Sequence, residues 1–505
     1  MKLPILIFMV CVIGFVLAGG CTNTASTPPE VTPTMEQPAT PTVQVPATLV
    51  QSTMPVSATD TVCGGLVSCG DTPTGVETQP VKSEGNSSSG RWGNEESGWD
   101  RSLQQTYDSG YIVSGGINAE VSPGHGSEDM WVVKLNPAGT IQWQQALGGS
   151  DREESFSIRE TLDGGYILTG VTDSDNTGDV GPNHGGSDIW VVKLKPSGGI
   201  QWQKVLGGKG FESGKSIYPT TDGGYILTGV TDSDNTGDVG PNHGGSDIWV
   251  VKLNQIGDIQ WQQVLGGEGD ESGRSILPTA GGEYILTGFT DSDNTGDVGP
   301  NHGGSDIWVV KLTPAGTILW QQVLGGSDRE ESFSIRQTLD TGFVLTGVTD
   351  SDNTGDVGPN HGGSDIWVVK LNPAGTIQWQ KVLGGKAFES GRSIDPTTDG
   401  GYILTGVTDS DNTGDVGPNH GGSDIWVVKL FQTGDIQWQK VLGGDGDESG
   451  RSIQQTADGL YILSGVTDSD NTGNVGPNNG GSAIWLVKLN PVGTIEWQQV
   501  LGENG

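Results

Sequence analysis

One pattern returns every 59 residues from about residue 90 onward, and this repeat constrains the fold more than any other feature of the chain. Its marker is a tryptophan followed by an apolar pair and Lys-Leu, found at Trp131, Trp190, Trp249, Trp308, Trp367, Trp426 and Trp485. A second tryptophan follows 12 residues after each marker, from Trp143 to Trp497. Seven such units fill nearly all of the length after residue 90. The chain is therefore a repeat array and not a string of unrelated domains.

Each unit has the pattern of four short strands joined by Gly-rich turns. In the unit that begins near Glu212, the strands are predicted over 215–220, 225–231, 247–253 and 258–265. The 85 glycines argue against a helical chain, because each glycine inside a helix costs about 1 kcal/mol.

The third and fourth predicted strands differ in their faces. Segment 247–253 is apolar on both faces, which is typical of a strand between two packed layers. In segment 258–265 apolar residues alternate with glutamine, which suits an outer strand. We therefore interpret the tryptophans as core residues, and a platform for stacking sugars is the alternative.

The two ends of the array are complementary. An outermost strand is complete at the end, Trp497 to Leu501, and an innermost strand opens the array, Ser102 to Thr106. An open solenoid would need polar caps at both ends, and neither end looks like one. We expect an all-β fold in which residues 91–505 form a seven-bladed β-propeller of 59-residue four-stranded repeats.

The segment before the array indicates export. Residues 1–20 combine Lys2 with an uncharged apolar run and small residues before Cys21, which resembles a prokaryotic lipoprotein signal with a lipidated Cys21. An uncleaved anchor helix is the alternative. Residues 21–90 are rich in Thr and Pro, which predicts a disordered stalk. Outside the cytoplasm Cys63 and Cys69 could form a small disulfide loop. We expect an extracytoplasmic, membrane-anchored lipoprotein at the cell surface.

The charge balance limits the partners. With 25 basic and 61 acidic side chains the formal net charge is −36. A field of this sign repels phosphates, so nucleic acid and anionic membrane surfaces are disfavoured. Cations, basic proteins and neutral glycans remain compatible partners.

The connection between the second and third strands is long, acidic and repeated. The sixteen-residue sequence Asp-Ser-Asp-Asn-Thr-Gly-Asp-Val-Gly-Pro-Asn-His-Gly-Gly-Ser-Asp occurs identically five times, from Asp173, Asp232, Asp291, Asp350 and Asp409. It should share a face with the passage between units, and the face with long loops is the expected binding side.

Its carboxylates resemble part of a calcium-binding loop, in which alternating acidic residues surround Ca²⁺ with hard oxygens. The predicted ligands are Asp173, Asp175, Asp179, Asp188, Asp232, Asp234, Asp238, Asp247, Asp291, Asp293, Asp297, Asp306, Asp350, Asp352, Asp356, Asp365, Asp409, Asp411, Asp415 and Asp424. The fit is partial, because Thr177 stands at a usual ligand position and His184 at the place of the bidentate Glu. The alternative is that Asp and Asn form Asx turns while Gly supplies positive φ.

The last copy of the loop changes three positions. Asn474, Asn479 and Ala483 replace the equivalents of Asp179, His184 and Asp188. Their joint loss favours a common role for the three residues, and drift in a terminal unit is the alternative explanation.

Three segments of the repeat are familiar: 222–229 (Asp-Gly-Gly-Tyr-Ile-Leu-Thr-Gly), 246–253 (Ser-Asp-Ile-Trp-Val-Val-Lys-Leu) and 259–263 (Ile-Gln-Trp-Gln-Gln). Together they resemble the propeller repeats of secreted prokaryotic cell-surface lipoproteins, some of which carry an endoglucanase label. The resemblance implies fold and location and brings no firm activity. The last two segments are also similar to the Trp-bearing repeat of quinoprotein dehydrogenases, but the cofactor ligands of that family are not found.

Repetition favours binding over catalysis. Catalysis needs groups with distinct pKa values, whereas near-identical units supply equal environments. Several equal weak sites give avidity instead. The sequence predicts a multivalent binding or scaffold module that meets a cell-surface protein or glycan through its acidic face, with Ca²⁺ as a candidate cofactor. A structural spacer without a specific ligand and a polysaccharide-active enzyme are the alternatives.

Overall fold

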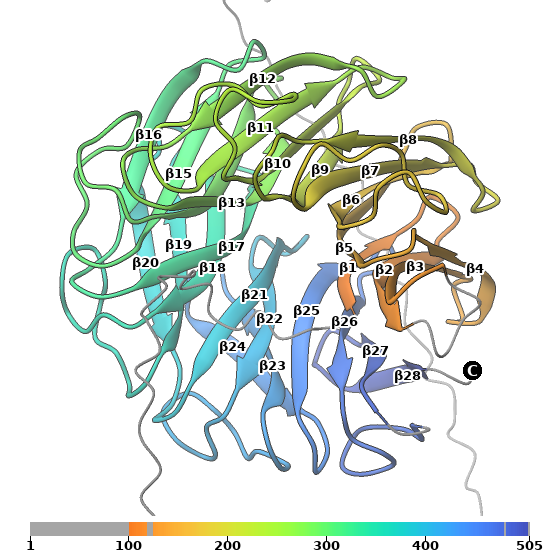
Figure 1. Cartoon of the computed structure of the whole chain (residues 1–505). Coiled ribbons are helices and arrows are strands. Elements are labelled where there is room, and N and C mark those ends of the chain that lie inside the picture. Colours follow the sequence, from red (N-terminus) through yellow and green to blue (C-terminus); the bar gives the residue numbers. More distant parts are fainter. Residues whose placement is uncertain (1–99, 119–124, 479–480, 503–505) are drawn as a thin grey trace, which may run out of the picture. The chain divides into compact units, whose positions relative to one another are not determined.

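The computed structural model describes residues 100–118, 125–478 and 481–502, and the predicted signal, stalk, Cys21, Cys63 and Cys69 lie outside this part. The described residues form seven four-stranded antiparallel sheets, each made of four strands that are consecutive in the chain, which confirms the predicted β-propeller (Figure 1). The strands of blades 1 to 4 are β1 (Asp100–Gln105), β2 (Tyr111–Asn118), β3 (Glu128–Leu135), β4 (Ile141–Leu147), β5 (Glu153–Glu160), β6 (Tyr166–Thr172), β7 (Asp188–Leu194), β8 (Ile200–Leu206), β9 (Glu212–Pro219), β10 (Tyr225–Thr231), β11 (Asp247–Leu253), β12 (Ile259–Leu265), β13 (Glu271–Pro278), β14 (Tyr284–Thr290), β15 (Asp306–Leu312) and β16 (Ile318–Leu324). Those of blades 5 to 7 are β17 (Glu330–Gln337), β18 (Phe343–Thr349), β19 (Asp365–Leu371), β20 (Ile377–Leu383), β21 (Glu389–Pro396), β22 (Tyr402–Thr408), β23 (Asp424–Leu430), β24 (Ile436–Leu442), β25 (Glu448–Gln455), β26 (Tyr461–Thr467), β27 (Ala483–Leu489) and β28 (Ile495–Leu501). No helix in the described part is long and apolar enough to cross a membrane.

The predicted strand boundaries hold with one notable shift. The second and third strands of blade 3 have the predicted bounds, but β9 begins at Glu212, three residues before the prediction. Glu212 belongs to the sheet because it pairs with Thr231 of β10, and the Thr231 hydroxyl donates to its carboxylate at 2.7 Å.

The hydrophobic core lies between the blades. Each of the seven core clusters combines residues of two neighbouring blades, so every middle strand is covered on both faces. The marker tryptophans are at most 7% exposed, which confirms the core interpretation for them. Trp249 satisfies its indole N–H by donating to Gln262 of the next strand at 2.9 Å.

The outer tryptophans connect one blade to the next. Trp379 of β20 meets Tyr402 of blade 6 with ring centroids 5.7 Å apart. It also covers Gly434 in a turn of blade 6, where a Cβ would lie 2.7 Å from the indole. An equivalent aromatic pair occurs at every junction, as edge-on or tilted contacts.

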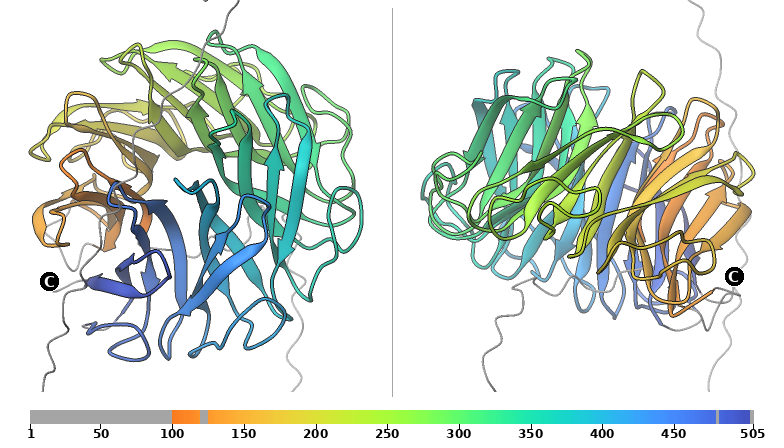
Figure 2. Two further views of the ribbon diagram at one scale, coloured as in Figure 1. Left: turned by 180° about the vertical axis from the view of Figure 1, so that it is seen from behind. Right: turned by 45° about the horizontal axis from the view of Figure 1, so that its top comes forward.

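The ring closes through these same contacts. Trp497 of blade 7 lies 5.8 Å from Tyr111 of blade 1, and the two blades share one core cluster. Lys488 of β27 donates to the Tyr111 hydroxyl at 2.9 Å. Among the described residues, no strand is exchanged between the first and last blades, because each of their sheets consists of four consecutive strands. Side-chain packing therefore closes the ring, in which the first and last blades lie side by side (Figures 1 and 2).

The connections divide the ring into two faces. The loops between the second and third strands (173–187, 232–246, 291–305, 350–364, 409–423 and 468–482) and the passages between blades form the loop face. The short turns after the first and third strands form the opposite, turn face. On the turn face, Lys252 at the end of β11 donates to Asp222 of the first turn at 2.9 Å, which joins the two turns of one blade.

Candidate functional site

The long loops fold back on themselves through two of their carboxylates. In blade 2 the Asn183 N–H donates to Asp175 at 3.1 Å, and the Ser187 hydroxyl donates to Asp173 at 2.5 Å. Asn176 has a φ of 52°, a left-handed conformation that asparagine tolerates better than most residues. These interactions are the Asx-type bonds of the alternative interpretation, and both aspartates remain exposed.

The third aspartate of each loop is bonded through its backbone N–H to the passage that precedes its blade. The Asp179 N–H donates to the Gly148 carbonyl at 2.8 Å, and Asp238 contacts Gly207 in the same way one blade later. The Thr177 hydroxyl accepts from the Ser150 N–H at 2.9 Å. Each long loop is thus fastened to the passage that leads into its own blade.

The fourth carboxylate is buried at the next junction. Asp188 is fully buried, and its Oδ2 accepts from the His184 N–H at 2.6 Å and lies 3.0 Å from His184 Nδ1. His184 Nε2 lies 3.9 Å from Asp238 of blade 3, so the imidazole stands between carboxylates of two blades. The structure therefore places Asp179 and Asp188 of one loop at different junctions, on the two sides of blade 2.

A second buried carboxylate, which the sequence analysis missed, accompanies Asp188. Glu212 of blade 3 is fully buried, and its oxygens accept from the Gly208 N–H and the Thr231 hydroxyl at 2.7 Å each. A Cβ built on Gly207 would lie 2.2 Å from Asp188 Oδ1 and 2.7 Å from Glu212 Oε2, so this glycine separates the two acids. The signal was present in the sequence, because this glutamate recurs every 59 residues from Glu153 to Glu448.

The same arrangement occurs at six junctions. In each, Oδ1 of the buried aspartate has no hydrogen-bond partner. The pairs are Asp129–Glu153, Asp188–Glu212, Asp247–Glu271, Asp306–Glu330, Asp365–Glu389 and Asp424–Glu448. A buried carboxylate oxygen without a partner carries a desolvation penalty that a proton or a cation would relieve.

The electrostatics of the pairs follow from burial. Burial raises the pKa of Asp247 to about 6, and the neighbouring Glu271 carboxylate adds to the rise. Asp424 behaves in the same way beside Glu448, with a pKa of about 6. Like charges in one desolvated space cannot both ionise without cost, so each pair favours a bound positive charge.

The substitutions of the last loop fall at two junctions. Asn474 takes the place of the loop aspartate beside blade 6, where it accepts from the Gly443 N–H at 3.4 Å. Ala483 begins β27, where its Cβ lies 3.3 Å from a Cβ built on Gly502, and Asn479 lies outside the described residues. Asn474 and Ala483 therefore lie on opposite sides of blade 7 and do not share a single site.

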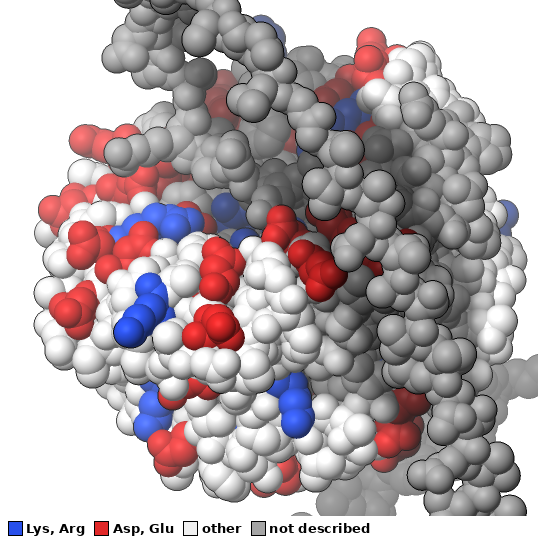
Figure 3. Space-filling view, turned by 90° about the horizontal axis from the view of Figure 1, so that it is seen from below, with Lys and Arg blue, Asp and Glu red and all other residues white. Residues whose placement is uncertain are grey.

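The predicted calcium ligands thus divide into exposed loop carboxylates and buried junction carboxylates. Among the described residues, no group of three or more His, Cys, Asp or Glu side chains is arranged to hold a metal ion. Each junction pair supplies two carboxylates, with the aspartate Oδ1 free of hydrogen bonds. Backbone carbonyls and water would have to complete the coordination of a cation there. Figure 3 shows acidic side chains in separate small groups, among basic and uncharged ones, on one face of the molecule.

Comparison with known proteins concerns the fold. No family model matches the chain. A regulatory protein of Caulobacter vibrioides, FlaEY, is 25% identical over 273 residues, which are 48% of this chain and 28% of that protein. The match thus spans less than a third of the curated relative's length.

Solved structures that resemble the chain are β-propeller proteins. Sqt1 from Chaetomium thermophilum has a TM-score of 0.42 at 11% identity, with 79% of this chain and 84% of that chain covered. YCF48 bound to D1 peptide has a TM-score of 0.39 at 11% identity, with 73% and 89% covered. A glucose dehydrogenase has a TM-score of 0.34 at 9% identity, with 62% and 93% covered. The chain is a seven-bladed β-propeller, a fold consistent with a binding or scaffold module.

Proposed function

We propose that this protein is a lipid-anchored, extracytoplasmic β-propeller that binds a cell-surface protein or glycan in a multivalent manner through its loop face. The observation that carries the proposal is the fivefold identity of the long loop, which presents the same exposed carboxylates from five neighbouring blades. A single central site would need different residues from different blades. Five equal loops suit a partner that itself offers repeated groups.

The loops support such a role because they are rigidly attached. Each loop is fixed to the passage before it by a backbone bond such as that from the Asp179 N–H to the Gly148 carbonyl. Each is also closed on itself by a bond such as that from the Asn183 N–H to the Asp175 carboxylate. Binding would therefore order little additional chain, so little conformational entropy is lost. The acidic side chains favour basic groups, and the hydroxyl and amide groups of Ser, Thr and Asn favour neutral sugars.

Calcium belongs to this proposal as a cofactor. The junction pairs hold two buried carboxylates and an oxygen without a partner, and hard oxygens of this kind are the ligands that Ca²⁺ prefers. A cation bound at a junction would attach two blades and the loop above them to each other. Anchoring through Cys21 would hold the ring at the membrane surface.

The test compares loop variants that keep the fold. Asn in place of the exposed loop aspartate retains the oxygen that accepts the backbone N–H, so the loop should keep its shape. The variants carry one, three or all five of the substitutions Asp175→Asn, Asp234→Asn, Asp293→Asn, Asp352→Asn and Asp411→Asn. The probes are a glycan array and a panel of synthetic basic peptides, each with calcium and with chelator.

For any probe that the wild-type ring binds, we expect the affinity to fall stepwise with the number of neutralised loops. The loss of affinity with all five loops neutralised should exceed five times the loss with one. Asp258→Asn with Asp435→Asn, on the turn face, serves as the control and should leave binding unchanged. Absence of binding to every probe by the wild-type ring would favour the spacer alternative, and release of reducing sugars from β-glucans would favour an enzyme.

A further inference from the structure

Within the innermost strand, the near-identical repeats differ most at one position. Much of that strand follows a period of three blades, since the sequence from Ser150 to Arg159 recurs from Ser327 to Arg336. The variable position departs from this period, because Tyr218 and Leu277 are replaced three blades later by Asp395 and Gln454. From blade 1 to blade 7 the residues at this position are Gln104, Arg159, Tyr218, Leu277, Arg336, Asp395 and Gln454.

These side chains belong to the strands that surround the centre of the ring (Figure 1). The Arg159 guanidinium lies 4.4 Å from the centroid of the Tyr218 ring and donates to its hydroxyl at 3.1 Å. It also donates to Ser102 of blade 1 at 3.2 Å. Arg336 Nε lies 3.7 Å from Asp395, whose other oxygen accepts from the Gln455 N–H at 3.1 Å.

The group acts as one electrostatic unit across the ring. Burial alone would raise the pKa of Tyr218, but Arg159 and Arg336 outweigh burial and hold that pKa below its usual value. Burial raises the pKa of Asp395 to about 6 even though both arginines oppose the rise. The guanidinium groups of Arg159 and Arg336 therefore both act on the Asp395 carboxylate. Arg336 and Asp395 are 20% and 23% exposed, so solvent reaches them.

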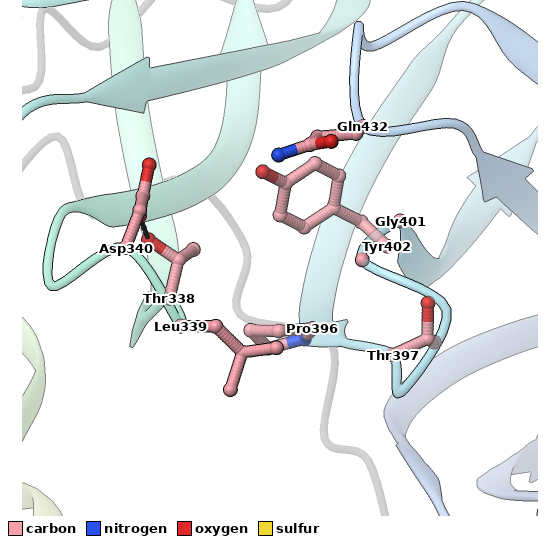
Figure 4. Close-up of a pocket in the computed structure, with 9 residues that line it drawn as sticks. Thr338, Leu339, Asp340, Pro396, Thr397, Gly401, Tyr402 and Gln432 are labelled. Carbon is pink, nitrogen blue, oxygen red and sulfur yellow. Dashed lines mark hydrogen bonds between the residues drawn. The ribbon is translucent and has the colours of Figure 1, made fainter. Parts of the chain in front are cut away.

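Exposed apolar side chains follow the two arginines on the turns of the same blades. Leu162 and Leu339, each three residues after an arginine, are 80% and 84% exposed. Leu339 lines a cavity of about 70 Å³ together with Pro396, the neighbour of Asp395, and with Tyr402 and Gln432 (Figure 4). The equivalent turn positions of blades 3, 4, 6 and 7 carry only Thr or Ala.

We propose that the turn-face ends of the innermost strands, around Arg159 and Arg336, bind one acidic, partly apolar peptide segment of a partner protein per ring. A carboxylate of the peptide would pair with Arg159 and Arg336, and an apolar side chain would enter the cavity beside Leu339. Guanidinium groups suit this task because their planar N–H groups match a carboxylate. The site is independent of the loop face, and its single copy contrasts with the five equal loops there.

The combination of features favours a peptide over a small anion. A small carboxylate would need the arginines alone, whereas exposed leucines on both arginine-bearing blades would contribute nothing to its binding. An exposed leucine at each of two turns, with a cavity beside one of them, indicates a ligand long enough to reach from the arginines to the turns.

The test uses fluorescein-labelled octapeptides with free carboxyl termini and the full-length protein. One peptide set carries two leucines and two glutamates, a second has glutamine for glutamate, and a third has serine for leucine. Fluorescence polarisation should show that the first set binds with a stoichiometry of one peptide per ring. The other two sets should bind clearly more weakly. Arg159→Gln with Arg336→Gln should weaken binding about tenfold or more, since charge-assisted hydrogen bonds are lost.

Matched controls lie on the same two blades. Arg152→Gln with Arg329→Gln makes the same change at the loop-face end of β5 and β17 and should leave peptide binding within about twofold. Leu162→Ser with Leu339→Ser alters only exposed side chains, so it should fold normally and still weaken binding. The fivefold loop variant should bind the peptide normally, which separates this site from the loop face.

Three results would overturn the proposal. One is no binding by any acidic leucine peptide, and another is equal loss in both arginine double variants. The third is displacement of the peptide by sodium acetate together with equal binding of the leucine and serine peptides, which would indicate a small-anion site.

Discussion

Ring closure by an outer tryptophan gives the sharpest test of the packing argument. Trp497 connects the last blade to the first through Tyr111, as Trp379 connects blade 5 to blade 6 through Tyr402, with centroid distances of 5.8 and 5.7 Å. If closure is one more junction of the same kind, then Trp497→Ala and Trp379→Ala should destabilise the ring equally.

The size of the effect follows from burial and ring contact. Replacing a fully buried Trp by Ala costs about 3–5 kcal/mol, and these tryptophans are half-buried. The aromatic pair adds about 0.5–1.5 kcal/mol beyond the buried area. We therefore expect each variant to lose about 2–4 kcal/mol of unfolding free energy.

The assay is urea unfolding followed by far-ultraviolet circular dichroism, since fluorescence would change with the tryptophan itself. A loss below about 0.5 kcal/mol for Trp497→Ala, beside a full loss for Trp379→Ala, would show that the ends of the array are not joined by this contact. Small losses in both variants would refute the claim that the outer tryptophans hold neighbouring blades together.

Three further predictions concern the junctions and turns. Asp247 has a folded-state pKa of about 6, above its ordinary value of 3.8, so its stabilising contribution is complete below pH 3.8 and is lost as the pH rises through 6. In chelator, Asp247→Asn should therefore add up to about 3 kcal/mol of unfolding free energy at pH 8 and almost nothing at pH 4, as measured by urea unfolding. Gly207→Ala should lose about 1–3 kcal/mol, because its Cβ would lie 2.2 Å from a buried carboxylate oxygen, whereas Gly199→Ala, which meets nothing within 4 Å, should unfold at the same urea concentration as wild type. The pKa of Asp222 is shifted in the opposite direction: burial raises it, but hydrogen bonds from a threonine, a lysine and a backbone N–H outweigh burial and lower the pKa to about 2. The stabilising contribution of Asp222 is therefore present above pH 3.8 and is lost as the pH falls through 2. Because this carboxylate is largely exposed, Asp222→Asn should lose less than about 1 kcal/mol of unfolding free energy at pH 7 and raise the acid-unfolding midpoint only slightly.

The repeat made most of the fold predictable. Short apolar runs bounded by Gly-rich turns predicted 225–231 and 247–253, and complementary ends predicted a closed ring. The early start of β9 escaped prediction because Glu212 is a residue that usually avoids burial. Its place in the sheet depends on Thr231 and on a backbone N–H, which are partners that a strand pattern does not show.

The candidate site was predictable only in part, because it forms between blades. The sequence places Asp179 and Asp188 in one loop, and a reading of that loop expects them to meet. In the structure the loop bridges blade 2, so Asp179 contacts Gly148 in the passage before blade 2, whereas Asp188 lies beside Gly207 and Glu212 in the passage to blade 3. The residues on both sides of a junction recur with the same 59-residue period. That period alone does not show which residues of neighbouring blades are in contact.

If the loop face depends on calcium as proposed, its repeated acidic junctions bind Ca²⁺ as equal sites. This is measured by calorimetric titration of Ca²⁺ into the full-length protein at pH 8, after removal of metal with chelator. We expect equivalent sites at about one per acidic junction, five or six in all, with a melting temperature that rises as they fill. Absence of heat, together with an unchanged melting temperature in calcium and in chelator, would contradict it and leave the loops as Asx turns with uncompensated acids beneath them.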